Sequence, residues 1–217
     1  IIRNSETSDA NKIAAMHALY KSIEYEDVKE AKGMLRGNHL YPAFYRLIKQ
    51  IGGFEVFWEH IVACLAEGRL PDVRDYGCKI VAGVVQRISS FDDAAYLFKK
   101  TETRNACIQM LITSLSDKSD LVILSASFAF CRICQSFSTS PEMLVPFQSN
   151  VRNMIQIFNV IVKCSDSVRG YLKQTLHVLL SNDKSGQVVN KMIEANSFQG
   201  LLQKMQSTAT EAASKTI

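Results

Sequence analysis

Three stretches of the chain repeat one apolar pattern, and this repeat constrains the fold more than any other feature. The stretches are DVRDYGCKIVAGVVQRI (72–88), DLVILSASFAFCRICQSF (120–137) and DSVRGYLKQTLHVLLS (166–181), in which Val73, Val122 and Val168 correspond at spacings of 49 and 46 residues. Each stretch begins with Asp, whose carboxylate favours the start of a helix because it interacts well with the N-terminal N–H groups. A repeat of this length predicts an array of helical units.

Two further helix-like segments follow each copy, so that every unit holds a long, a short and a medium helix. The short segments are residues 92–100, 140–150 and 185–195, and the medium ones are 104–117, 151–164 and 197–205. A weaker copy of the long segment lies at residues 8–23. Apolar residues recur at i, i+3, i+4 and i+7, while alternating strand-like runs are few. We therefore expect an all-α protein.

One such unit cannot bury its own apolar face, so neighbouring units must stack and share a core. We expect a single domain over residues 1–217, with an irregular N-terminal part at 8–70 and clearer repeats at 71–117, 119–164 and 165–206. The polar tail, 207–217, is expected to fray. The chain begins without Met, as a fragment of a longer protein would.

The last unit, LKQTLHVLLSNDKSGQVVNKMIEANSFQGLLQKM (172–205), resembles the armadillo repeat. Leu172 and Leu176 take core places of the family's long helix, and Val189 and Ile193 follow on its small helix. Asn196 stands where the family often has Gly, a change that a left-handed helix end tolerates. The resemblance covers 72–207 well and 8–64 loosely, and does not separate armadillo from HEAT repeats. It implies a right-handed α-solenoid of about four to five armadillo-like three-helix repeats.

Armadillo proteins bind extended peptides on a concave face built from the long helices, often through Trp and Asn. In this chain the Trp-like positions are His17, Lys79, Phe128 and Gln174, and the Asn-like positions are Lys21, Gly83, Arg132 and Val178. None is Trp or Asn, so we do not expect the peptide ladder of nuclear import receptors. Phe128 is expected in the core, given its neighbours Leu124 and Phe130.

The residues that remain on this expected face are polar and mildly basic, and they are our candidates for partner binding. They are Lys21, Lys79, Gln86, Arg87, Arg132, Gln135, Gln174 and His177. Their basic side chains could pair with acidic groups on a partner. The other interpretation is that they are simply the solvated surface of the helices.

A second candidate surface lies in the aromatic segment FEVFWEHIVACL (54–65). Phe54, Phe57 and Ile61 share one helical face, and Trp58, the only Trp of the chain, extends it. Trp is enriched at the centres of protein interfaces, which makes Trp58 a candidate contact residue. A helix with aromatic residues at this spacing is also typical of a core.

The positions of the cysteines favour a reducing compartment, the cytoplasm or the nucleus. The motifs of the chain disfavour metal binding and enzymatic catalysis. The six cysteines fall mostly on apolar helical positions, where a free thiol acts as a small hydrophobe. The pair Cys131 and Cys134 has the spacing of a redox or zinc half-site, but it lies within a helix and no second pair completes a zinc set. We expect no metal, no cofactor and no catalytic residue, and therefore no enzyme, because phosphate-loop and nucleophile motifs are missing.

Charge and hydropathy narrow the class of partner. A formal charge of +4 is mild for a nucleic-acid-binding protein, since Lys and Arg are scattered among nearly as many acids. The longest nearly apolar run, 121–131, is too short to span a bilayer. The N-terminus becomes polar at once, so we expect no signal peptide.

These observations predict a non-enzymatic scaffold or adaptor that binds a protein or peptide on the concave face or the N-terminal aromatic helices. Acidic proteins and peptides are among the partners that the basic side chains favour. We expect no small-molecule substrate. Two alternatives remain open. One is an Hsp70-type cochaperone, which rests on analogy of fold. The other is a HEAT-like nucleic-acid-binding protein or enzyme, which the mild charge disfavours.

Overall fold

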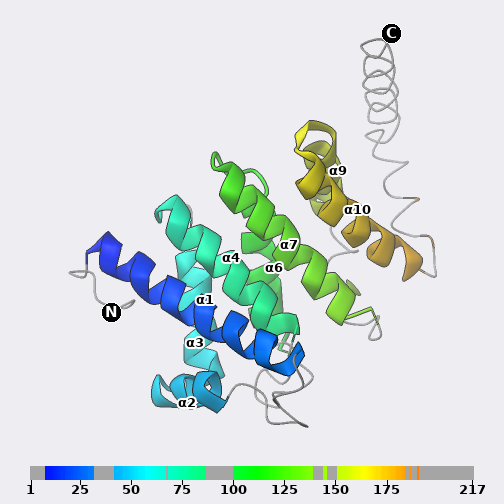
Figure 1. Ribbon diagram of the computed structural model, residues 1–217. Coiled ribbons are helices and arrows are strands. Elements are labelled where there is room, and N and C mark those ends of the chain that lie inside the picture. Colours follow the sequence, from blue (N-terminus) through cyan, green and yellow to red (C-terminus); the bar gives the residue numbers. More distant parts are fainter. Residues whose placement is uncertain are drawn as a thin grey trace. The chain divides into compact units, whose positions relative to one another are not determined.

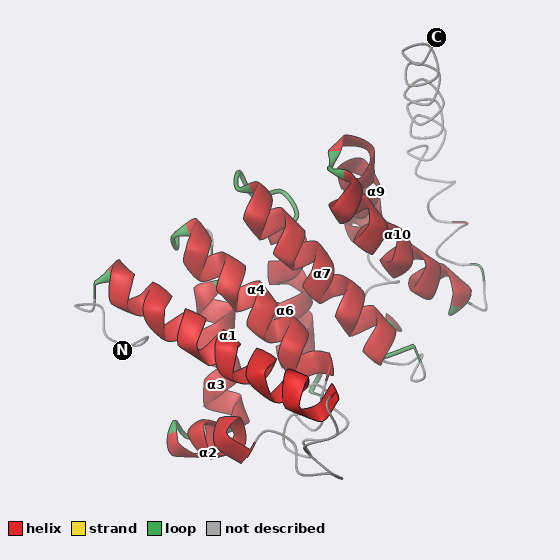
Figure 2. Cartoon of the chain, viewed as in Figure 1, coloured by secondary structure: helices red, strands yellow, loops and turns green. Residues whose placement is uncertain are grey.

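The computed structural model describes residues 8–31, 42–66, 68–86, 100–138, 144–145, 151–183, 186 and 190. Across these residues all regular secondary structure is helical (Figure 2), which confirms the all-α prediction. The helices are α1 (Asp9–Ala31), α2 (Pro42–Gln50), α3 (Phe54–Cys64), α4 (Pro71–Gln86), α6 (Thr101–Ser114), α7 (Asp120–Ser136), α9 (Val151–Lys163) and α10 (Asp166–Ser181).

The three repeated stretches form the helices that the sequence predicts. Helices α7 and α10 begin at the predicted Asp120 and Asp166, and α4 begins one residue before Asp72, at Pro71. Proline suits a first helical position because the N–H it lacks has no partner within the helix there. The predicted short helices and the segment 197–205 lie wholly or mostly outside the described residues.

The chain divides into two compact units, residues 1–136 and 137–217, which we call unit 1 and unit 2. In unit 1, α1, α4 and α7 lie side by side with α4 in the middle, and α3 and α6 pack behind them (Figure 1). Helices α4 and α7 run parallel. Ser125 donates a hydrogen bond to the Asp75 carboxylate near their N-terminal ends, and Ser136 Oγ donates to the Val85 carbonyl (3.3 Å) near their C-terminal ends.

Helices α4, α7 and α10 bury the same five positions of the repeat. The buried residues are Val73, Gly77, Ile80, Val81 and Val84 in α4, Val122, Ala126, Ala129, Phe130 and Ile133 in α7, and Val168, Leu172, Thr175, Leu176 and Leu179 in α10. Helix α1 departs from this pattern, since Met16 and Ile23 are its buried apolar residues among those described. The apolar spacing of the three clear copies thus selects the inward face of each helix.

A buried network of charged groups ties α4 to the connection between α6 and α7. The Arg74 guanidinium donates to both carboxylate oxygens of Asp117, at 2.8 and 2.9 Å, and both side chains are less than one-tenth exposed. Asp75 of α4 accepts from Ser125 of α7 and pairs with Lys79 at 2.7 Å. Because each buried charge has a partner, the network fixes how α4 and α7 sit against each other.

Unit 2 repeats part of this arrangement within α9 and α10. Arg169 stands at the repeat position of Arg74 and donates to the carbonyls of Ile161 (3.2 Å) and Cys164 (3.0 Å) at the end of α9. It also pairs with Asp166 at 2.6 Å. Carbonyls at a helix end lack partners within the helix, so this arginine joins the start of α10 to the end of α9.

A candidate binding surface on α1, α4 and α7

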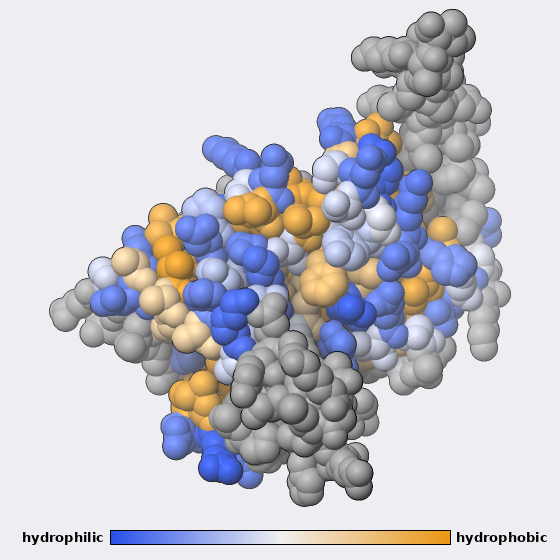
Figure 3. Space-filling view, in the orientation of Figure 1, coloured by the Kyte–Doolittle hydropathy of each residue, from blue (hydrophilic) through white to orange (hydrophobic). Residues whose placement is uncertain are grey.

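The outward stripe of α4 and α7 is built from equivalent repeat positions. Tyr76, Lys79 and Gly83 are half-buried on α4 and Gln86 is exposed at its end. On α7, Phe128 and Arg132 are half-buried and Gln135 is exposed. Figure 3 shows this side of unit 1 as a mixture of polar and apolar side chains. Such a surface can offer both charges and apolar contacts to a partner.

Aromatic and basic side chains interleave where α1 meets α4. The His17 ring stacks on the Tyr76 ring with centroids 5.3 Å apart, and Tyr20 lies 6.1 Å from Tyr76. The Lys79 ammonium lies 5.2 Å from the centre of the Tyr76 ring and 5.9 Å from that of Tyr20. Lys21 Nζ is also 5.9 Å from the Tyr20 ring. These cation–π contacts hold the two lysines against the rings.

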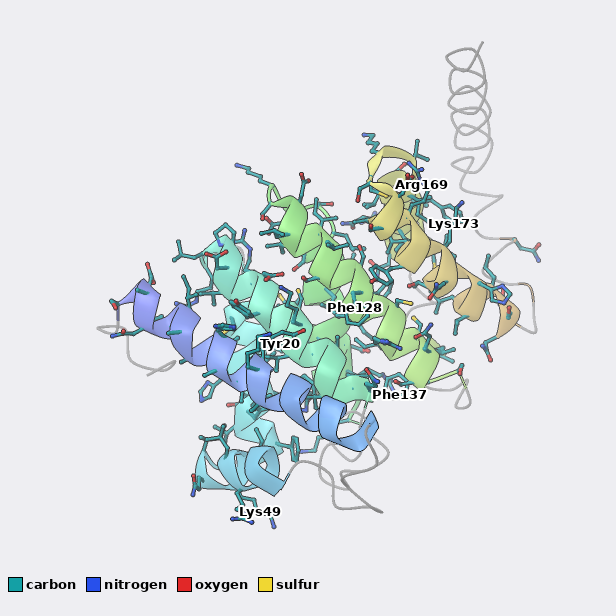
Figure 4. The ribbon with its side chains drawn as sticks, in the orientation of Figure 1. Tyr20, Lys49, Phe128, Phe137, Arg169 and Lys173 are labelled. Carbon is teal, nitrogen blue, oxygen red and sulfur yellow. The ribbon has the colours of Figure 1, made fainter. Side chains whose placement is uncertain are left out.

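A similar pair lies on α7. The Arg132 guanidinium carbon is 5.1 Å from the centre of the Phe128 ring, and Nη1 donates a long hydrogen bond of 3.4 Å to Gln135 Oε1. Its Nε is buried and has no hydrogen-bond partner. Among the described residues no carboxylate pairs with Arg132. Tyr20 and Phe128 are labelled in Figure 4, on α1 and α7 at either side of α4.

We call these residues the cation–aromatic band: Tyr20, Lys21, Tyr76, Lys79, Phe128 and Arg132. The cations differ in how far the protein already neutralises them. Lys79 pairs with the buried carboxylate of Asp75, whereas Arg132 rests on a ring and on a neutral amide. A guanidinium stacked on an aromatic ring keeps donors for a carboxylate, which it can bind through two hydrogen bonds. Of these two cations, Arg132 is thus the one that no described carboxylate neutralises.

Gly83 lies where α4 packs closely against α1. A Cβ atom built at this glycine would lie 2.8 Å from Cγ2 of Ile23 on α1. A larger side chain at this position would require Ile23 or α1 to shift. The glycine therefore allows the two helices to pack closely.

The polar residues that the sequence predicts as partner contacts are divided between the two units. Lys21, Lys79, Gln86, Arg132 and Gln135 lie on the described long helices of unit 1, whereas Gln174 and His177 are exposed on α10 in unit 2. Arg87 lies outside the described residues. The sequence does not indicate Tyr20 and Tyr76 as contacts, because their proximity depends on the packing of α1 against α4.

The structure decides between the two interpretations of Trp58 and corrects the expected place of Phe128. Trp58 is 1 % exposed and packs edge-on against Phe57 at 5.5 Å, so it belongs to the core and offers no direct contact to a partner. Phe128 is half-buried and lies under Arg132, instead of lying in the core with its neighbour Phe130. Helical spacing marks both as apolar positions, and only the packing shows which one reaches the surface.

The cysteines of the described residues are poor nucleophiles. Cys131 and Cys134 are both buried, and burial raises the pKa of the Cys134 thiol well above its usual value. Burial also raises the pKa of Cys107 to about 12. In the described part of the chain no three His, Cys, Asp or Glu side chains gather as a metal site requires. None of the described helices is both long and apolar enough to cross a bilayer.

Comparison with known proteins adds no family. No protein-family model matches the chain, and neither does any curated protein or solved structure. The case for a function therefore rests on the residues and geometry of the cation–aromatic band.

Proposed function

We propose that the chain is a non-enzymatic protein-interaction module, a scaffold or adaptor of the cytoplasm or nucleus, that binds an extended acidic segment of a partner protein. In this proposal the helices belong to a right-handed α-solenoid of about four to five armadillo-like repeats, and the segment crosses α1, α4 and α7. The observation that carries the proposal is Arg132, which is half-buried on the Phe128 ring and has no carboxylate partner among the described residues.

Charge complementarity supports an acidic partner. The band presents a guanidinium and two ammonium groups, and Asp75, the carboxylate that pairs with Lys79, is buried. A charge-assisted hydrogen bond from Arg132 to a carboxylate is stronger than its present long bond to Gln135. The incoming carboxylate would thus improve the pairing of Arg132 instead of competing with an existing ion pair.

The aromatic rings favour a peptide over a single-stranded nucleic acid. Proteins that bind single strands offer aromatic faces on which bases stack. Here the Phe128 ring carries Arg132, and the Tyr76 ring is in contact with both His17 and Lys79. A base would have to displace these groups before it could stack, whereas a carboxylate approaches the cations directly.

Helix spacing indicates how acidic residues should recur along the partner. Packed helices lie about 8–10 Å apart. A polyproline II segment has three residues per turn and rises about 3.1 Å per residue, so every third side chain points the same way at intervals of about 9 Å. A partner with Glu or Asp at every third residue would therefore meet the cations of neighbouring helices in turn.

The test uses fluorescence anisotropy with a labelled peptide of four Glu-Pro-Pro repeats and a matched peptide of four Gln-Pro-Pro repeats. Measurements are made at physiological ionic strength, where distant charges are screened over about 8 Å. We expect the glutamate peptide to bind at least tenfold more tightly. Arg132→Gln should weaken it about tenfold, which corresponds to about 1.4 kcal/mol.

The control variant is Lys118→Gln, which removes an exposed cation from the connection between α6 and α7 and should leave binding unchanged. Equal affinity for the two peptides, or no effect of Arg132→Gln, would contradict the proposal. A single-stranded RNA of twelve nucleotides serves as the competing ligand. If it binds more tightly than the glutamate peptide, the partner of this surface is a nucleic acid and the proposal of an acidic segment is wrong.

A further inference from the structure

A cavity of about 260 Å³ lies in unit 1, outside the cation–aromatic band. Its walls come from the N-terminal half of α1, the C-terminal half of α3, the connection that follows α3, and the start of α4. Its larger apolar lining residues are Leu70, which is exposed, and Met16 and Val73, which are buried. Its polar lining residues are Asp9, Lys12, His60 and Arg69. This combination of apolar walls and a few polar groups is typical of small-ligand sites.

Lys12 lies beside the cavity with little compensation for its charge. Its side chain is 13 % exposed, and its ion pair is with Asp9, at 3.8 Å. Asp9 is itself mostly exposed, so the pair is loose and contributes little. Among the described residues no acceptor lies within hydrogen-bond distance of Lys12 Nζ. Because this pair is loose, an anion that enters the cavity can take the place of Asp9 beside the ammonium group.

Arg69 places a second cation at the same cavity. Its Nε donates to the Ala63 carbonyl at 3.4 Å, and its charge opposes the rise in the pKa of Cys64 that burial causes. Arg74, held by Asp117, donates to the Arg69 carbonyl and fixes the backbone of the connection. The cavity wall is therefore anchored to the buried network of α4.

We infer that this cavity binds a small organic anion, whose carboxylate or phosphate group lies between Lys12 and Arg69 and whose apolar body contacts Met16, Leu70 and Val73. An apolar cavity of about 150 Å³ holds benzene, so 260 Å³ admits about ten non-hydrogen atoms. Burial raises the pKa of the Cys64 thiol, which disfavours its reactive thiolate form at this cavity. The anion replaces Asp9 as the partner of Lys12.

The test is an NMR titration of the full chain with phenylacetate, phenyl phosphate and the neutral amide phenylacetamide. We expect saturable shifts at Met16 and Val73 with one or both anions, and at least tenfold weaker binding of the amide. Lys12→Met keeps the length and apolar stem of the side chain and should weaken anion binding at least tenfold. Asp9→Asn removes the competing carboxylate and should tighten binding several-fold.

The melting temperature of each variant, without ligand, shows whether it remains folded, and Lys118→Met is the control for loss of one exposed cation. If neither anion gives saturable shifts up to 20 mM, about the weakest affinity a titration resolves, the inference is wrong. It is equally wrong if the amide binds as well as phenylacetate, or if Lys12→Met binds like the unmodified chain. None of these results bears on the peptide proposal, which depends on other residues.

Discussion

Arg74 and Arg169 occupy the same place in two copies of the repeat, and each reaches back to the backbone that precedes its helix. Arg74 donates to the Arg69 carbonyl and Arg169 to the Cys164 carbonyl, in both cases five residues earlier. In the copy between them this position is Ile123. A single guanidinium thus joins the start of a long helix to the preceding connection in two of the three clear copies.

Removal of the buried partner of Arg74 should be costly. Asp117→Asn leaves the guanidinium buried without a carboxylate, and the loss of one member of a buried ion pair typically costs about 3–5 kcal/mol. We expect urea denaturation to show a free energy of unfolding lower by about 3 kcal/mol. Asp120→Asn, at the exposed first residue of α7, should cost less than about 1 kcal/mol. Equal effects of the two substitutions on the free energy of unfolding would show that the buried pair contributes no more to stability than an exposed carboxylate.

The same pair predicts a pH dependence of stability. Burial alone would raise the pKa of Asp117. Hydrogen bonds from Arg74 and the Ser119 N–H, together with the charge of Arg74, outweigh this effect and hold the pKa below the ordinary value of 3.8. The contribution to stability is therefore complete above pH 3.8 and is lost as the pH falls through the lower folded pKa. Between pH 5 and pH 2.5, Asp117→Asn should flatten the fall in unfolding free energy; an unchanged slope would contradict this assignment.

Thiol reactivity should follow burial. Burial raises the pKa values of Cys78, Cys107, Cys134 and Cys164. The first three are fully buried, whereas Cys164 is half-buried at the end of α9. Since the thiolate is the reactive form, we expect iodoacetamide at pH 8 to label Cys164 first in the native protein. Mass spectrometry of the labelled peptides measures the order, and labelling of Cys107 at the rate of Cys164 would show that the core opens readily.

At the scale of helices, two glycines should respond to alanine in opposite ways. Gly83 faces Ile23 at the contact of α1 with α4, where a Cβ atom would lie 2.8 Å from the Ile23 side chain. Ile23 is β-branched and adjusts poorly, so Gly83→Ala should destabilise unit 1 by about 1 kcal/mol despite the gain in helix propensity. Gly170 in α10 has no atom within 4 Å of the built Cβ. Gly170→Ala should therefore stabilise the protein by about 0.5–1 kcal/mol.

Urea denaturation measures both changes, and each glycine serves as the control for the other. If Gly83→Ala stabilises the protein as much as Gly170→Ala, then α1 and α4 can separate at no cost, and the close approach at Gly83 does not fix their packing.

The sequence predicts helices well where the signal is local. The starts of α7 and α10 and the inward faces of the three repeated helices follow from Asp at the first position and from apolar spacing. The exposure of single side chains does not follow in this way. Trp58 and Phe128 both occupy apolar helical positions, yet the first lies in the core and the second under Arg132. The contact of Tyr20 with Tyr76 joins residues of different helices, and a pattern within one helix cannot show it.

At the scale of unit 1, packing and the proposed recognition of a partner depend on opposite faces of the same helices. The inward faces of α4 and α7 share a core and the buried network around Arg74 and Asp75, which holds the two helices in fixed register. Their outward positions are thereby placed at regular intervals. The proposed binding of an acidic segment depends on this regularity, because its carboxylates must meet cations on successive helices.

The most direct test of the acidic-segment proposal is an NMR titration that locates the peptide on the protein. Amide and side-chain shifts are followed while the peptide of four Glu-Pro-Pro repeats is added. We predict that the perturbed residues lie on the outward stripes of α1, α4 and α7, with the largest changes at Lys79 and Arg132. Perturbations confined to α3 and α6, or none at saturating peptide, would contradict the account.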